Sequence, residues 1–177
     1  NKGAIENYNL ATNLNPDLVD AFVKRGHARV QSGNKSGAIE DYKQAIKLNP
    51  NNFYTYNYFI FDALGDKKGA VEQCNQAIKI NPHIAENYLC RGNVRSDLGD
   101  NKGAIEDYNQ AIKLNCDYVS AYNNRGDIRN ILGDKESAIK DFSRAININN
   151  NFIYAYINRG NIRSHLGDKQ GAIEDYN

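Results

Sequence analysis

The chain has 177 residues, of which 41% are hydrophobic and 24% charged, and its 22 Lys and Arg residues nearly balance its 21 Asp and Glu residues. A formal net charge of +1 removes the simplest argument for a protein of nucleic acids or membrane surfaces, because both need a basic excess. No apolar run approaches the roughly 18 residues that span a bilayer, so we expect no membrane insertion. The start, Asn1-Lys2-Gly3, has neither an initiator Met nor an apolar leader, and we expect a fragment of a longer protein.

Cysteine and histidine are too sparse and too scattered for a metal site. The three cysteines form no C-x-x-C pair, and the three histidines form no H-E-x-x-H pair. An odd number of widely spaced cysteines also argues against a disulfide framework. We therefore expect no metal and no cofactor. Few cysteines fit a reducing compartment, which weakly favours the cytoplasm, but the sequence leaves the localisation unknown.

A repeated six-residue word is the main signal along the chain. Gly-Ala-Ile-Glu-Asn-Tyr at 3–8 recurs in related form at 37–42, 69–74, 103–108, 137–142 and 171–176, in steps of 34, 32, 34, 34 and 34 residues. Such a fixed period indicates stacked supersecondary units in place of one compact domain. In chain order, we predict a second helix of a preceding repeat, a repeat, a short repeat, two further repeats and an incomplete repeat, at 1–18, 19–52, 53–84, 85–118, 119–152 and 153–177.

Within each unit the apolar spacing predicts two antiparallel helices with short connections. Apolar residues follow the i, i+3/i+4, i+7 pattern of a helix face. Between the two helices stands Gly followed by Asp or Asn, at 33–34, 65–66, 99–100, 133–134 and 167–168. Gly closes a helix in the left-handed conformation, and Asp or Asn caps the start of the next helix. Asn-Pro at 15–16, 49–50 and 81–82 is expected to stop the second helix.

The repeat resembles the tetratricopeptide repeat (TPR) family over nearly the whole chain. In the unit at 85–118 the matching positions are Tyr88, Gly92, Ala104, Tyr108 and Ala111. The wording also looks like bacterial, particularly cyanobacterial, arrays of this family. The resemblance implies an all-α fold, a right-handed α-solenoid of antiparallel helix pairs with about five repeats. Cys116 and Asn150 replace the closing proline of the family, and Tyr58 stands where the family has Gly, which predicts a local widening.

Arginines recur on the packing side of the first helix, where an unpaired guanidinium group would be severely unfavourable. The second helix carries an Asp beside its core stripe. In the short repeat Asn57 and Phe61 replace the arginines and Gln73 replaces the Asp, so both partners are lost in one unit. We therefore predict structural Arg–Asp pairs within each unit. An anion-binding arginine ladder remains the alternative. The sets are Arg25, Arg29 and Asp41; Arg91, Arg95 and Asp107; Arg125, Arg129 and Asp141; and Arg159, Arg163 and Asp175.

The opposite side of the first helix lines the concave ligand groove in the TPR family, so the resemblance implies a partner-binding groove here. Its positions carry acids and amides but no Lys or Arg. The predicted groove residues are Asp20, His27, Glu86, Asn93, Asp97, Asn123, Asp127, Asn130, Asn161 and His165. Amides can both donate to and accept from a peptide backbone. The alternative is that an exposed helix face is simply polar.

The sequence favours a protein-interaction scaffold that binds a peptide or partner helix, with a basic or amide-rich partner, and no catalytic role. Binding of acidic chaperone tails is disfavoured, because the family's carboxylate clamp needs groove lysines and Leu89 and Ile157 stand at such positions. RNA binding is disfavoured by the acidic groove. The other possibility is a substrate-recruiting arm of an enzyme whose catalytic domain lies outside this chain. The identity of the partner, the parent protein and the oligomeric state remain unknown from the sequence.

Overall fold

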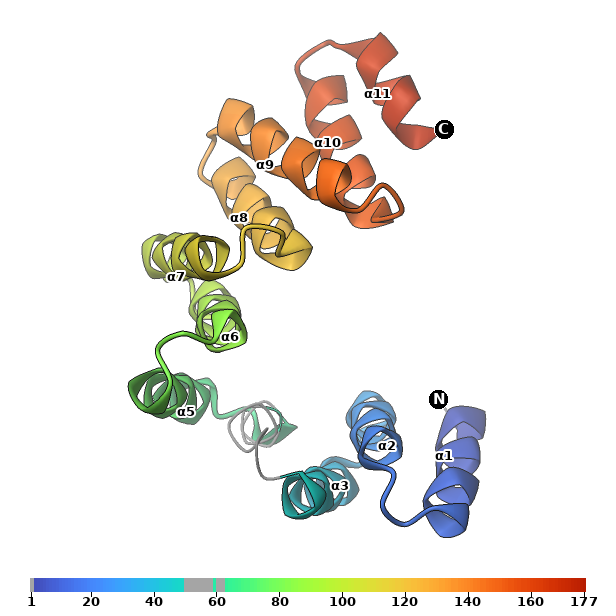
Figure 1. Ribbon diagram of the computed structural model, residues 1–177. Coiled ribbons are helices and arrows are strands. Elements are labelled where there is room, and N and C mark those ends of the chain that lie inside the picture. Colours follow the sequence, from blue (N-terminus) through green and yellow to red (C-terminus); the bar gives the residue numbers. More distant parts are fainter. Residues whose placement is uncertain (1, 50–58, 60–62) are drawn as a thin grey trace. The chain divides into compact units, whose positions relative to one another are not determined.

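A computed structural model of the chain describes residues 2–49, 59 and 63–177. All secondary structure in these residues is helical, in antiparallel pairs of a helical-repeat fold (Figure 1). The helices are α1 (Lys2–Leu14), α2 (Val19–Gln31), α3 (Lys35–Leu48), α5 (Lys67–Ile80), α6 (Ala85–Asp97), α7 (Asn101–Leu114), α8 (Val119–Ile131), α9 (Lys135–Ile148), α10 (Ile153–His165) and α11 (Lys169–Tyr176). In this part of the chain, no helix is both long and apolar enough to cross a membrane.

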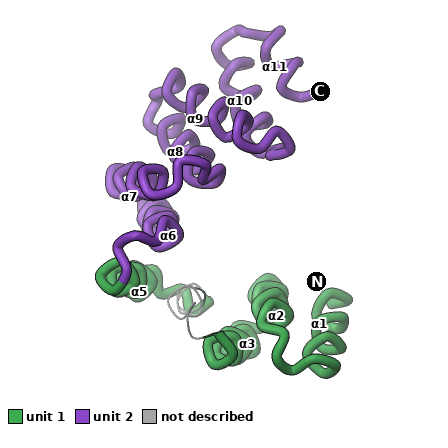
Figure 2. The backbone as a smooth tube through the Cα atoms, in the orientation of Figure 1, with its two compact units in different colours: residues 1–80 green, residues 81–177 purple. Residues whose placement is uncertain are grey.

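The chain divides into two compact units, residues 1–80 and 81–177 (Figure 2). In the second unit each first helix (α6, α8, α10) packs against the second helix that follows it (α7, α9, α11). Each second helix then packs against the next first helix, and α8 also contacts both α6 and α10. The three first helices therefore form one continuous face, called here the first-helix face of the second unit.

The turn between the helices of a pair follows the predicted Gly-Asp chemistry. The glycines at 33, 65, 99, 133 and 167 have φ between +77° and +87°, the left-handed region that closes a helix without a Cβ penalty. The next residue then caps the following helix: the Asp100 carboxylate accepts from the Gly103 backbone N–H at 3.0 Å. Both predictions are confirmed at these turns, which mark where the first helices α2, α6, α8 and α10 end.

The second helix stops at an asparagine, whether or not proline follows. α7 and α9 end at Leu114 and Ile148 although Cys116 and Asn150 replace the closing proline. The side chain of Asn115 accepts from the Asp117 backbone N–H at 3.1 Å, and Asn149 accepts from Asn151 N–H at 3.0 Å. This side-chain turn competes with the helix for backbone hydrogen bonds. It explains how these repeats keep a 14-residue second helix without proline.

An aromatic ring of the second helix fills the space above a glycine of the first helix. Phe142 is fully buried, and a Cβ added at Gly126 would lie 2.8 Å from its ring. At Gly92 the same added atom would lie 2.7 Å from the ring of Tyr108. The close approach of the two helices therefore requires glycine at these positions. The widening expected at Tyr58 falls outside the described residues, as do Asn57 and Phe61.

Gly126→Ala should lower the free energy of unfolding by about 1 kcal/mol. Overpacking against Phe142 costs about 1–3 kcal/mol, and the better helix propensity of alanine returns up to about 1 kcal/mol. Urea unfolding followed by circular dichroism measures the difference. Gly3→Ala is the control, because no atom lies within 4 Å of the added Cβ there. A more stable Gly126→Ala variant would mean that the ring moves aside without cost.

Candidate functional site

The recurring arginines and aspartates form a buried ionic layer between the two helices of a pair in every repeat except the short one at 53–84, which lacks these residues. Around Asp141, the Arg125 Nη2–Oδ1 distance is 2.6 Å and the Arg129 Nη1–Oδ2 distance is 2.7 Å. The Asp141 side chain is only 4% exposed. The same arrangement of two guanidinium groups on one carboxylate joins Arg25 and Arg29 to Asp41, Arg91 and Arg95 to Asp107, and Arg159 and Arg163 to Asp175.

The first arginine of the set also reaches back to the preceding repeat. Arg125 Nη1 donates to the Asn109 side-chain oxygen at 2.6 Å, and its guanidinium carbon lies 5.4 Å from the centre of the Tyr122 ring. Arg159 Nη1 likewise donates to Ser143 Oγ at 2.9 Å. The guanidinium donors are thus directed at partners inside the chain. This favours a structural role for the arginines over the alternative of an anion-binding ladder.

On the first-helix face, tyrosine side chains of two second helices donate hydrogen bonds to asparagine side chains of the first helices. The Tyr108 hydroxyl of α7 donates to Asn93 Oδ1 at 3.0 Å, and Tyr176 of α11 donates to Asn161 Oδ1 at 2.7 Å. The two partners are 15 residues apart in both cases. In the repeat at 119–152, the residue that corresponds to Tyr108 is Phe142, which has no hydroxyl group to donate. The residue that corresponds to Asn93 is Asp127.

Asp127 receives its hydrogen bonds from two amides. Asn123 Nδ2 of the same helix donates to Oδ2 at 3.2 Å, and Asn158 Nδ2 of α10 donates to Oδ1 at 2.8 Å. A similar bond links α6 and α8, because Asn124 Nδ2 donates to Asn93 Oδ1 at 2.9 Å. A chain of amide and carboxylate groups therefore runs across all three first helices.

Burial raises the pKa of Asp127 to about 6, although the hydrogen bond from Asn123 opposes part of this rise. The pKa of the Tyr108 phenol is also raised, first by burial and then by the charges of Asp97 and Asp127. The Asp127 carboxyl therefore changes charge closer to neutral pH than a solvated aspartate does.

Three of the predicted groove residues meet around one cavity between α6, α7 and α8. The cavity measures about 290 Å³ and includes Asn93 and Asp97 of α6 and Asp127 of α8. The remaining lining residues are Ser96, Tyr108, Asn124, Ile128 and Ile131. We call this space the Asp127 cavity.

The other predicted groove residues of the second unit do not line this cavity. Glu86, Asn130, Asn161 and His165 are exposed on their helices. Asn123 is expected from the sequence to face a partner, but the structure buries it to 7% exposure. Its Nδ2 donates to Asn124 and Asp127, and its Oδ1 accepts from Asn158. Asn123 therefore supports Asp127 and has little capacity left for a partner.

In the first unit, Asp20 is exposed and His27 is half-buried. His27 Nδ1 lies 3.2 Å from the Tyr42 hydroxyl, and its ring packs edge-on against Phe59 at 4.6 Å. His27 also lines a cavity of about 350 Å³ with Lys24, Ala28, Gln31, Ala4 and Tyr8. Lys24 is not among the groove positions predicted from the sequence, but in this unit it lines the same cavity as His27.

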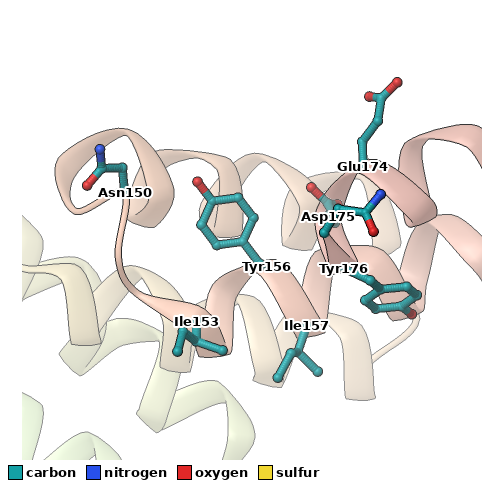
Figure 3. Close-up of a pocket in the computed structure, with 8 residues that line it drawn as sticks. Asn150, Ile153, Tyr156, Ile157, Glu174, Asp175 and Tyr176 are labelled. Carbon is teal, nitrogen blue, oxygen red and sulfur yellow. The ribbon is translucent and has the colours of Figure 1, made fainter.

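A larger cavity of about 590 Å³ lies between α10 and α11, and its lining includes Tyr156 and Ile157 of α10 and Tyr176 of α11 (Figure 3). In the preceding repeat, Val119 and Tyr122 correspond to Ile153 and Tyr156, and they pack against a core cluster that includes Ala145 and Ile146 of α9. The corresponding space of the preceding repeat is filled by the chain's own α9.

The sequence does not predict the roles of three residues at these sites. Asn124 and Asn158 donate hydrogen bonds to Asn93 and Asp127, and Lys24 lines the cavity of the first unit. All three stand at the same register position, immediately before the first arginine of the repeat. Their alignment with Asp127 and His27 at i and i+3 of one helix is the signal that could have identified two of them. In the described residues, no group of three or more His, Cys, Asp or Glu side chains is placed to hold a metal ion.

Comparison with known proteins agrees with the repeat architecture. No curated protein sequence matches the chain. Among solved structures, MamA is 26% identical with a TM-score of 0.66, over 85% of this chain and 90% of that chain. The TPR protein TTC0263 of Thermus thermophilus is 17% identical, with a TM-score of 0.71 over 89% and 88%. YrrB, described as a TPR protein with an unusual peptide-binding site, is 16% identical with a TM-score of 0.61, over 95% and 88%.

Family models give the assignment directly. A model described as TPR repeat matches residues 26–58 and 92–129. A second model, described as tetratricopeptide repeat, matches 59–84, 119–152 and 153–177. Together the two models cover most of the sequence and both units. The chain belongs to the tetratricopeptide repeat family.

Proposed function

We propose that this chain is a non-catalytic interaction scaffold, and that the first-helix face of its second unit binds a peptide or a partner helix with basic or amide-bearing side chains. The observation that carries the proposal is the lining of the Asp127 cavity. Two carboxylates and two side-chain amides meet there, and no Lys or Arg is among the described residues that line it. Opposite charge steers a basic segment toward such a surface and disfavours an acidic one.

The surroundings of the cavity support a protein partner. Glu86 is exposed on the same helix as Asp97, and Ile131 and Tyr154 are exposed at 68% and 69%. A face that combines acids, amides and single apolar side chains suits an extended or helical peptide. The peptide-binding site named for YrrB, a protein of the same fold, makes this class of function a reasonable expectation here. A nucleic-acid partner is disfavoured by the same negative charge.

The test is binding of the chain to a peptide array graded from acidic to basic, read at low and moderate salt. We expect capture of basic peptides that weakens as salt rises, because exposed charges are screened. Asp97→Asn combined with Asp127→Asn should reduce capture by about tenfold or more, the effect of losing one or two charge-assisted contacts.

Glu106→Gln is the matched control, because it removes the same charge from an exposed position on α7, away from the first-helix face. It should leave capture unchanged. Equal binding of acidic and basic peptides would contradict the proposed charge preference. Silence of the whole array would contradict peptide binding by this face.

A further inference from the structure

The Asp127 cavity has the dimensions of a pocket for one side chain. Binding sites for drug-sized ligands and cofactors usually measure roughly 300–1,000 Å³. At about 290 Å³, this cavity lies just below that range. Its lining comes from two neighbouring first helices and the second helix between them, so it is a hollow in the first-helix face and can receive a side chain of a segment lying along that face.

Asp127 supplies the cavity with a carboxylate that no cation among the described residues neutralises. Every hydrogen bond that the structure gives to its oxygens comes from a neutral amide. The buried aspartates of the ionic layer are different, because each is held by two guanidinium groups. A carboxylate that is partly removed from water gains most from a positively charged partner.

The hydrogen bonds around Asp127 leave room for such a partner and orient it. Each carboxylate oxygen accepts one amide hydrogen, which leaves a further lone pair on each oxygen. A planar guanidinium fork matches two carboxylate oxygens at once, whereas an ammonium group does not. Ile128 and Ile131 line the same cavity and offer an apolar wall for the methylene stem of a long side chain.

The cavity of the first unit provides a comparison within the same chain. Its residues Tyr8, Lys24, His27, Ala28 and Gln31 correspond in register to Tyr108, Asn124, Asp127, Ile128 and Ile131, each 100 residues later. The hollow itself therefore recurs with the repeat, but its chemistry does not. Lys24 and His27 occupy the positions of Asn124 and Asp127, so negative charge is specific to the cavity of the second unit.

From these observations we infer that the Asp127 cavity binds the guanidinium group of an arginine side chain of the partner. This inference rests on the proposed function and names the side chain that the first-helix face selects. Asp127 forms the two-oxygen contact, Asp97 adds negative charge at the same cavity, and the isoleucines contact the stem. Asn123 and Asn158 hold the carboxylate in position.

The test uses two small probes, N-acetyl-arginine amide and N-acetyl-citrulline amide, which have nearly the same shape but differ in charge. Titration of the ¹⁵N-labelled chain, followed through the side-chain amide signals of Asn124 and Asn158, reports binding at the cavity. We expect saturable shifts with the arginine probe and binding weaker by about tenfold or more with citrulline, because the charge-assisted pair is lost. Equal shifts with both probes, or no shift with arginine, would overturn the inference.

Variants locate the site. Asp127→Asn should remove the arginine response, and so should Asn124→Lys with Asp127→His, which copies the lining of the first unit. Glu106→Gln should retain the response. If Asp127→Asn responds as the unchanged chain does, the inference is wrong. If the array captures basic peptides equally well with and without Asp127, the arginine pocket is contradicted and the proposed function stands. If the array stays silent but the arginine probe binds saturably, the pocket stands and the proposed function is contradicted.

Discussion

Asp141→Asn should lower the free energy of unfolding by about 3–5 kcal/mol, the cost of removing one partner from a buried ion pair. The substitution keeps the shape of the side chain but removes its charge. Arg125 and Arg129, with side chains only 13% and 25% exposed, would then face each other without a counterion. Urea unfolding of the unchanged chain and the variant measures the difference directly.

An ion pair between this repeat and the preceding one provides a matched control for the substitution. Arg144 and Asp117 form an ion pair at 3.3 Å, but their side chains are 47% and 67% exposed. Asp117→Asn should therefore cost less than about 1 kcal/mol, because exposed pairs are solvated and screened. Equal costs at Asp117 and Asp141 would show that burial does not determine the strength of the inner pair.

A double-mutant cycle of Asp141→Asn with Arg125→Met separates the pair from its surroundings. We expect the double variant to be more stable than the sum of the single costs implies, by about 1–3 kcal/mol, because the second change removes a charge that the first left unpaired. Additive costs would contradict direct coupling. Some cost should remain in the double variant, since Arg125 also bonds to Asn109 and stacks on Tyr122.

The features that were predictable from the sequence are those that depend on local spacing. The helix pairs follow from apolar periodicity, and the turns at 99–100 and 133–134 follow from the backbone needs of Gly and Asp. The Arg–Asp pairs could also be predicted from the sequence. The first arginine and the aspartate of each set are always 16 residues apart, and both residue types are absent from the short repeat. Family models then place the repeat word in the TPR family independently.

The contacts that build the Asp127 cavity could not be predicted in the same way. The bond from Asn158 to Asp127 joins residues 31 apart, on different repeats, and an amide side chain has many possible partners. A helix-face argument says that Asp127 points away from the paired helix, but it does not say how closely α8 and α10 approach. Asn123 shows the limit, because it lies on the predicted face and is nevertheless buried under its neighbours.

Asp127→Asn should raise the free energy of unfolding by about 1–2 kcal/mol at pH 7.5. Burial raises the pKa of this carboxyl from 3.8 to about 6, so the folded chain holds the proton more tightly than the unfolded chain. The stability that this proton contributes is fully present below about pH 4 and is lost as the pH rises through 6. A shift of two pKa units corresponds to about 2.7 kcal/mol, and partial exposure to solvent reduces that value.

Urea unfolding at pH 7.5 and at pH 4 measures this dependence. Near pH 4 both side chains are neutral in the folded chain, and the difference between the variant and the unchanged chain should fall below about 1 kcal/mol. The other ionisable groups at the cavity are Asp97 of α6 and Tyr108 of α7, beside the ion-paired Asp107. Asp97→Asn is the control, because Asp97 is exposed and its substitution should change stability by less than about 0.5 kcal/mol. A loss of stability in Asp127→Asn at both pH values would mean that the amide hydrogen bonds outweigh the burial cost.

The chain itself shows that asparagine is tolerated at this register, since Asn93 and Asn161 occupy the corresponding positions of the neighbouring repeats. If the Asp127→Asn variant is more stable than the unchanged chain at neutral pH, stability of the fold does not account for an aspartate at position 127. A costly carboxylate in a side-chain-sized cavity is then best explained by a bound cation, which would offset the cost. If the same single variant gains stability and loses arginine binding, Asp127 contributes to partner binding and not to the stability of the repeat.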